Sequence, residues 1–199
     1  MRYWLAKTLL ALFGWRVAGA APDLPKYVLV VAPHTSNWDF PVMLALAIAL
    51  RIKVTWMGKH TLFRPPFGWL MRRLGGLPIE RTARHNVVEQ AIESFRASDR
   101  LALAILPEGT RKRTPYWRSG FYHIASGAHV PIVLGFADYQ RKVGGIGPVI
   151  TLSGDIEADM ALIRDFYIGV VGKRPDQFGK IRLRSQEDDA RERPKRPTA

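Results

Sequence analysis

The chain has 199 residues, a net charge of +13 and no cysteine. This length is sufficient for one domain with a buried core, and the lack of cysteine excludes disulfide bonds and thiolate metal ligands. The excess of positive charge indicates an anionic partner. Nucleic acid, anionic lipid and phosphorylated small molecules are the candidate classes.

The N-terminal segment, residues 1–14, predicts a membrane-interface helix over 2–13, followed by a strand around 15–18. One alternative is a signal peptide, but Lys7 and Arg16 interrupt its apolar region. Another is ordinary docking of this helix onto the core. Spanning a bilayer takes about 20 consecutive apolar residues, and no such run is present, so we expect a peripheral (monotopic) protein on the cytoplasmic side of the membrane.

Short apolar runs then alternate with helical patterns along the chain. The predicted strands cover residues 27–32, 54–57, 101–106, 130–136 and 149–152, and the predicted helices cover 38–50, 67–74, 86–97, 119–127 and 156–171. This alternation indicates an α/β fold, with a mostly parallel mixed sheet flanked by helices in a single domain over 15–173. Residues 174–199 are rich in charge and proline, which predicts a mobile tail.

Positive charge is concentrated between residues 51 and 84, where eight Lys or Arg stand against Glu80 alone. Large apolar side chains, among them Trp56, Phe67 and Trp69, are interleaved with these basic residues. Such a mixture is typical of a membrane interface rather than of a solvated DNA-binding face. We therefore expect a membrane surface with anionic lipid as a partner, and no nucleic acid.

A histidine and an aspartate, His34 and Asp39, follow the first buried run. A neutral imidazole can accept a proton near pH 7, and a neighbouring carboxylate can fix its tautomer. The two meet only if His34 lies in the turn after the strand and Asp39 in the first helical turn, with Ser36 or Asn37 as the cap. Taken alone, the pair also fits a structural histidine beside a helix-capping aspartate.

Two later loops also carry unusual charge. The loop at 76–82 contains Arg81, which either binds a phosphate through its guanidinium fork or lies in solvent. The other loop, Pro107-Glu108-Gly109-Thr110-Arg111, follows a fully apolar run, and such positions face the ligand crevice in open α/β sheets. There Glu108 accepts hydrogen bonds from a substrate or braces Arg111, unless the segment is a basic surface turn.

The remaining histidines show no metal-ligand spacing, and no Walker A loop, dinucleotide fingerprint or nucleophile elbow is present. No metal and no cofactor is therefore expected.

Together, and in this order, these motifs resemble the glycerophospholipid acyltransferase family. His34 and Asp39 match its H-x4-D motif, the segment 76–81 its second block, Pro107 to Arg111 its P-E-G-T-R block, and Val130-Pro131-Ile132 its fourth block. The similarity extends over roughly residues 15–137. H-x4-D alone is a weak signal, but its combination with P-E-G-T-R is a strong one.

The resemblance implies transfer of an acyl group from acyl-CoA or acyl carrier protein to the hydroxyl of a lysophospholipid, with a lysophosphatidate-type acceptor first. His34 would be the general base and Asp39 would orient it. The substrate would be bound by Arg81, Glu108, Gly109, Thr110 and Arg111. Two alternatives stay open: a non-enzymatic module that binds anionic lipid or nucleic acid, and a thioesterase on the same fold.

Overall fold

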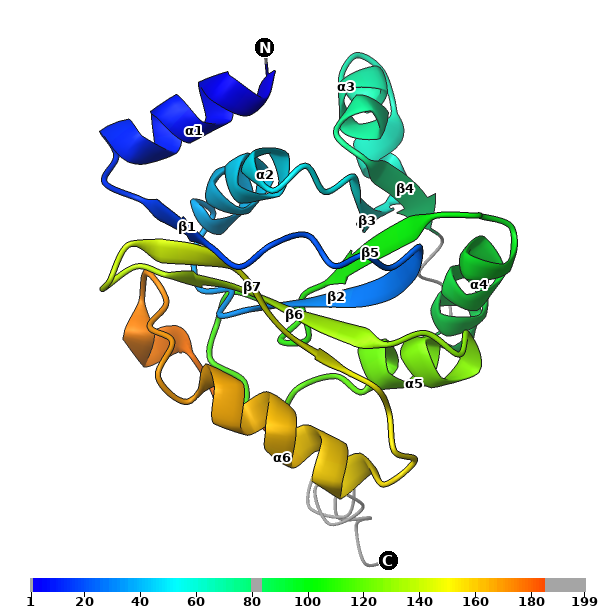
Figure 1. Ribbon diagram of the computed structural model, residues 1–199. Helices are drawn as coiled ribbons and strands as arrows, with labels where there is room; N and C mark the ends of the chain where they lie inside the picture. Colours follow the sequence, from blue (N-terminus) through cyan, green and yellow to red (C-terminus); the bar gives the residue numbers. More distant parts are fainter. Residues whose placement is uncertain (1, 80–83, 185–199) are drawn as a thin grey trace, which may run out of the picture.

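The structure is a computed structural model that describes residues 2–79 and 84–184 (Figure 1). At its centre is a seven-stranded sheet with the order β1-β7-β6-β2-β5-β3-β4. Neighbouring strands are parallel except for β6 and β7. The strands are β1 (Arg16–Ala18), β2 (Lys26–Ala32), β3 (Val54–Lys59), β4 (Gly76–Ile79), β5 (Leu101–Ile105), β6 (Ile132–Asp138) and β7 (Val143–Ile150). The predicted α/β class and mostly parallel mixed sheet are confirmed.

Helices cover both faces of this sheet (Figure 1). They are α1 (Arg2–Leu12), α2 (Asp39–Ala49), α3 (Gly68–Arg73), α4 (Arg84–Arg96), α5 (Gly120–Gly127) and α6 (Ile156–Tyr167), with 3₁₀ turns at His60–Phe63 and Pro175–Gln177. The apolar sides of α4, α5 and α6 pack on one face. On the other face α2 covers the sheet, and α1 packs in turn on α2.

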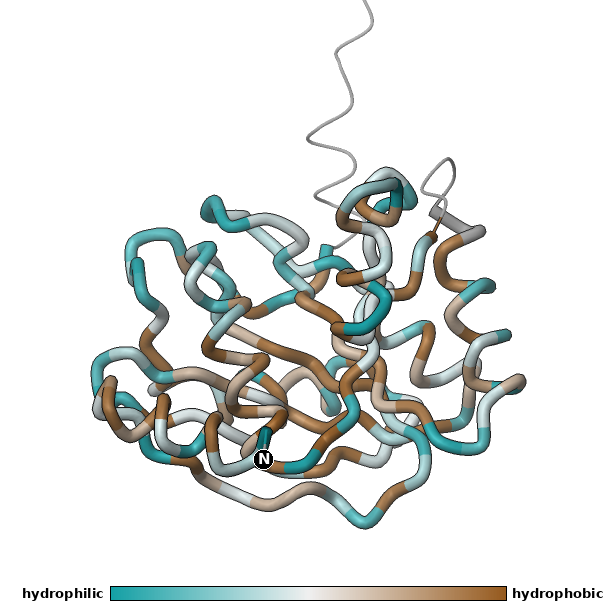
Figure 2. Tube along the Cα trace, turned by 90° about the horizontal axis from the view of Figure 1, so that it is seen from above, coloured by the Kyte–Doolittle hydropathy of each residue, from teal (hydrophilic) through white to brown (hydrophobic). Residues whose placement is uncertain are grey.

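The central strand β2 is buried on both sides. Val28, Val30 and Ala32 belong to the core cluster shared with α4, α5 and α6, whereas the residues between them face the α2 side, because side chains alternate along a strand. Figure 2 shows the result as hydrophobic stretches at the centre of the molecule and hydrophilic ones around the rim. Polar chemistry can therefore begin only after the strand ends, which is where His34 lies.

Three elements differ from the sequence prediction. Residues 76–79, predicted as part of a loop, form the edge strand β4, where Pro78 is tolerated because an edge strand leaves one side of its backbone unpaired. β7 begins at Val143, well before the predicted 149–152, because its glycines conceal the strand pattern. Helix α6 ends at Tyr167 rather than at residue 171.

The sequence predicts a mobile tail from residue 174 onward, yet residues 174–184 pack on the domain. The Arg174 N–H donates to Thr35 Oγ1 at 3.1 Å, and the Trp117 N–H donates to the carbonyl of Arg182 at 2.7 Å. Hydrogen bonds of its main chain thus hold the segment 174–184 on the domain, although its composition alone indicates a solvated segment. Residues 185–199 lie outside the described part of the chain.

Helix α1 has one side on the protein and one side exposed. Ala6 and Leu10 are buried in a cluster with Leu46 of α2, whereas Trp4 and Leu12 are 68 % and 76 % exposed. The predicted helix over 2–13 thus docks on the domain and still presents large apolar side chains outward. Among the described residues, no helix is both long enough and apolar enough to cross a bilayer.

Candidate active site

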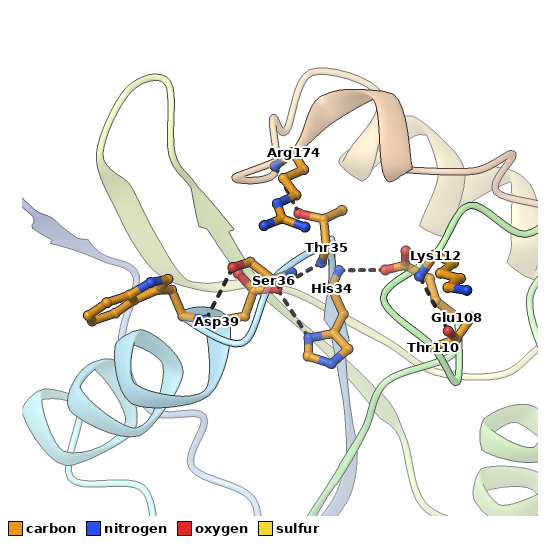
Figure 3. Close-up of polar contacts among 9 residues, drawn as sticks. His34, Thr35, Ser36, Asp39, Glu108, Thr110, Lys112 and Arg174 are labelled. Carbon is orange, nitrogen blue, oxygen red and sulfur yellow. Dashed lines mark hydrogen bonds and ion pairs between the residues drawn. The ribbon is translucent and has the colours of Figure 1, made fainter.

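His34 and Asp39 lie where β2 ends and α2 begins (Figure 3). The structure brings their side chains together, with His34 Nδ1 3.1 Å from Asp39 Oδ2. The imidazole is partly exposed at 17 %, whereas Asp39 is only 3 % exposed. One ring nitrogen thus faces a buried carboxylate, which leaves Nε2 as the nitrogen able to take a proton from a substrate.

The loop between the two residues is folded around the Asp39 carboxylate. Oδ2 accepts the backbone N–H groups of Thr35 and Ser36, each at 2.8 Å. Neither Ser36 nor Asn37 caps α2 as predicted: the N-cap position is Trp38, which makes no side-chain cap, and the Ser36 hydroxyl accepts the Trp38 N–H at 3.2 Å. Asp39 is the first residue of α2, and its carboxylate accepts the backbone N–H groups of the turn that precedes the helix.

Asp39 stays ionised at neutral pH despite its burial. Burial raises the pKa of its carboxyl group, but the hydrogen-bonding groups of His34, Ser36 and Tyr139, with the charge of His34, bring that pKa below its ordinary value. A fixed negative charge beside Nδ1 favours the tautomer with a proton on that nitrogen and stabilises the imidazolium once it forms.

Glu108 reaches the same loop from the other side. Its Oε1 accepts the backbone N–H of His34 at 2.6 Å, and the residue is only 2 % exposed (Figure 3). Burial raises the pKa of Glu108 to about 8; the His34 N–H lowers it, and the charge of Asp39 raises it further. In this structure the carboxyl group contacts the main chain of His34, so its predicted contact with substrate stays a prediction.

The rest of the predicted substrate loop turns back at Gly109. This residue has φ +66°, and a Cβ added there would lie 2.5 Å from Nε of Arg118. Glycine therefore allows the turn and lets the Arg118 side chain pack on its face. Thr110 Oγ1 accepts the Lys112 N–H at 3.3 Å. Arg111 is exposed and, among residues 2–79 and 84–184, forms no ion pair.

Arg81 lies outside the described residues. The structure adds three groups that sequence reasoning missed: the exposed Arg118 beside Gly109, Tyr139 near Asp39, and Arg174, whose N–H holds Thr35. The sequence offers one signal for Arg118, which is that it lies only seven residues after Arg111. Tyr139 and Arg174 are more than 95 residues from the loop they contact, and no local pattern connects them with it.

Within the described ranges, no cluster of three or more His, Asp or Glu side chains is suited to hold a metal ion. The site contains one imidazole, two buried carboxyl groups and the arginines beside them.

The chain is similar to known proteins both in sequence and in fold. A family model described as Acyltransferase matches residues 21–134, which is more than half of the chain. A 1-acyl-sn-glycerol-3-phosphate acyltransferase from Streptococcus pneumoniae is 31 % identical over 121 residues, which are 56 % of this chain and 45 % of that protein. The chain thus spans less than half the length of this curated relative.

The fold also has a solved counterpart. The crystal structure of the 1-acyl-sn-glycerophosphate (LPA) acyltransferase from Thermotoga maritima superposes with a TM-score of 0.61 at 18 % identity, over 84 % of this chain and 76 % of that one. The match to the family model, together with these two proteins, confirms the predicted resemblance. The chain belongs to the acyltransferase family.

Proposed function

We propose that this protein transfers a fatty acyl group from acyl-CoA or acyl carrier protein to the hydroxyl of a lysophospholipid. The favoured acceptor is of the lysophosphatidate type. The observation that carries the proposal is the contact between His34 Nδ1 and the buried, ionised Asp39. That arrangement leaves the other ring nitrogen as a base for a hydroxyl, which is the chemistry an O-acyltransferase needs. Both relatives also carry names that refer to an acylated glycerophosphate.

In the proposed reaction, Nε2 of His34 takes the proton of the acceptor hydroxyl while the hydroxyl oxygen attacks the thioester carbonyl. The tetrahedral intermediate then collapses, the carbon–sulfur bond breaks, and the imidazolium returns its proton to the leaving thiolate. Asp39 stabilises the transient imidazolium throughout. The products are an ester and a free thiol, so neither a redox partner nor a covalent enzyme intermediate is required.

The arginines beside Gly109 are proposed to bind the phosphate of the acceptor. Arg111 and Arg118 are exposed and form no ion pair within the described residues, so both are available for an anion. A guanidinium binds phosphate through two parallel hydrogen bonds. Arg81, from the second block, is proposed to act with them, Thr110 to line the same loop, and Gly109 to let Arg118 approach it.

The acyl chain and the membrane are proposed to meet the apolar side of α1, α2 and α3. Phe40 and Trp56 form an edge-to-face pair at 5.8 Å, which is continued by Phe63. Phe67 and Trp69 of the α3 region are exposed, and so are Trp4 and Leu12 of α1. Large exposed apolar side chains among basic residues suit a lipid surface, which supports a peripheral protein on the cytoplasmic side of the membrane.

The test is transfer of a radiolabelled acyl group from acyl-CoA, and separately from acyl carrier protein, to a panel of lysolipids with and without phosphate. Replacing His34 by Ala should lower kcat about 10²–10⁴-fold, whereas His123→Ala, at an exposed histidine of α5, should leave it unchanged. Undiminished transfer by folded His34→Ala protein would refute the proposal, as would release of free fatty acid alone, which indicates a thioesterase.

In the same assay, Arg111→Ala and Arg118→Gln should raise KM only for phosphorylated acceptors.

A further inference from the structure

The two oxygens of the Asp39 carboxylate have different surroundings. Oδ2 accepts two backbone N–H groups and faces His34. Oδ1 is buried, and no hydrogen bond of good geometry reaches it from the described residues. A buried carboxylate oxygen without a donor is costly, and native structures rarely leave one unsatisfied.

The Tyr139 hydroxyl is in the same condition, because it is buried and has no partner of good geometry among the described residues. The two groups nevertheless act on each other. Burial raises the pKa of Tyr139 far above its ordinary value, and the nearby charged carboxylate of Asp39 raises it further. Tyr139 is one of the groups that lower the pKa of Asp39. The phenol is therefore a neutral donor beside an ionised acceptor.

The position of Tyr139 is fixed by contacts that involve no substrate. The residue follows directly on the end of β6, and its backbone N–H donates to the carbonyl of Val171 at 2.8 Å. Its ring packs edge-on against Trp15 at 4.9 Å with an interplanar angle of 87°. A side chain held in this way can position a neighbour before any substrate arrives.

We propose that Tyr139 is a positioning residue whose hydroxyl donates to Oδ1 of Asp39 and thereby keeps Oδ2 directed at Nδ1 of His34. The series Tyr139–Asp39–His34 then extends the catalytic pair into the core. The inference rests on the proposed function for its kinetic consequences, but not for its structural ones.

Other charged groups face this series and must be kept constant in any test. The Lys173 ammonium lies 5.9 Å from the centre of the Tyr139 ring and 4.9 Å from that of Trp38. Glu108 is the second carboxyl group within electrostatic reach of Asp39. None of these side chains is changed in the variants below.

The first measurement needs no enzymatic activity. Tyr139→Phe removes only the hydroxyl, so a donor to the charged form is lost and the pKa of Asp39 should rise. Carbon-13 NMR titration of the side-chain carboxyl groups reports this, with the Asp39 signal assigned from its loss in Asp39→Asn. The matched control is Tyr122→Phe, which removes a hydroxyl that donates at 2.8 Å to another buried aspartate, Asp159. It should leave the titration of Asp39 unchanged.

The second measurement is kinetic. Loss of one hydrogen bond to the orienting carboxylate should lower kcat about five- to tenfold, with KM for the acceptor unchanged. In an Asp39→Asn background the same Tyr139→Phe substitution should change kcat less than about twofold, because its effect passes through the carboxylate.

The outcomes separate the two proposals. Wild-type protein that transfers no acyl group refutes the proposed function, while the NMR titration still decides the role of Tyr139. An unchanged Asp39 titration in folded Tyr139→Phe protein overturns the inference. So does an equal loss of kcat with and without Asp39, since that outcome indicates a purely structural role. Thermal unfolding of each variant checks that the protein remains folded.

Discussion

Among single residues, the buried carboxyl group of Glu108 has a consequence for stability. Burial raises its pKa to about 8 from an ordinary 4.5. Between these pH values the folded protein holds a proton that the unfolded chain has released. The stabilising contribution of this group is therefore complete below about pH 4.5 and is lost as the pH rises towards 8.

We therefore expect Glu108→Gln, which cannot ionise, to lose less stability than wild type between about pH 5 and pH 8. As the pH rises, the Tm of the variant should increase relative to that of wild type, by about 2–4 °C for each kcal/mol of difference in the free energy of unfolding. Thermal unfolding followed by circular dichroism at each pH measures it. Glu93→Gln, at an exposed glutamate of α4, is the control. Parallel Tm curves for wild type and Glu108→Gln would show that Glu108 does not bind this proton.

Contacts between residues of one local motif could be predicted from the sequence. The spacing of His34 and Asp39 is such a case, because a strand end and a first helical turn bring the two together. The hydrogen bond from the His34 N–H to Glu108 crosses 74 positions, and the Tyr139 hydroxyl approaches from a third element. Their placement depends on the register of neighbouring strands, which no single segment encodes.

At the scale of elements, the segment 172–174 supports the loop that carries His34. A Cβ added at Gly172 would lie 2.8 Å from Thr35 Oγ1 and 3.0 Å from the Cβ of Pro33. We expect Gly172→Ala to separate this segment from the loop, at a cost of about 1–3 kcal/mol in the free energy of unfolding, and to lower kcat.

Urea denaturation and the acyl transfer assay measure these two effects. Gly169→Ala is the matched control, since a Cβ there meets only Arg141 Nη1 at 3.9 Å. If Gly172→Ala has the stability and kcat of the control, this segment does not support the loop.

The elements that could be predicted best are those with a continuous apolar run or a clear helical period. β2 and β5 are buried on both faces, and their runs were visible in the sequence. β4 and β7 were missed or shortened because proline and glycine weaken their pattern, while pairing with β3 and β6 forms them nonetheless. The segment after residue 174 is a further case in which tertiary contacts override a solvated composition.

At the scale of the whole molecule, the net charge of +13 and the exposed apolar side chains of α1 and α3 together predict binding to an anionic lipid surface. The protein should bind vesicles that contain anionic lipid more tightly than zwitterionic ones, and salt should weaken that binding by screening the charges. Co-sedimentation at low and high salt measures both effects.

The apolar share of this binding can be tested separately. Replacing Trp4 and Leu12 together by Ser should weaken vesicle binding about a hundredfold or more, because each apolar side chain buried in the lipid contributes about 1.5–3 kcal/mol. Leu162→Ser, at an exposed position of α6, should not. Equal binding by both variants would exclude α1 from the lipid contact.

The packing of α1 on α2 also matters for protein engineering. The inner side of α1 covers Leu46 of α2, and α2 begins with Asp39 itself. A truncation that starts at residue 15 would uncover that surface, and a replacement helix would need an inner side designed for α2. The helix proposed to meet lipid is therefore not an exchangeable module: a new anchor and the catalytic domain would have to be designed together.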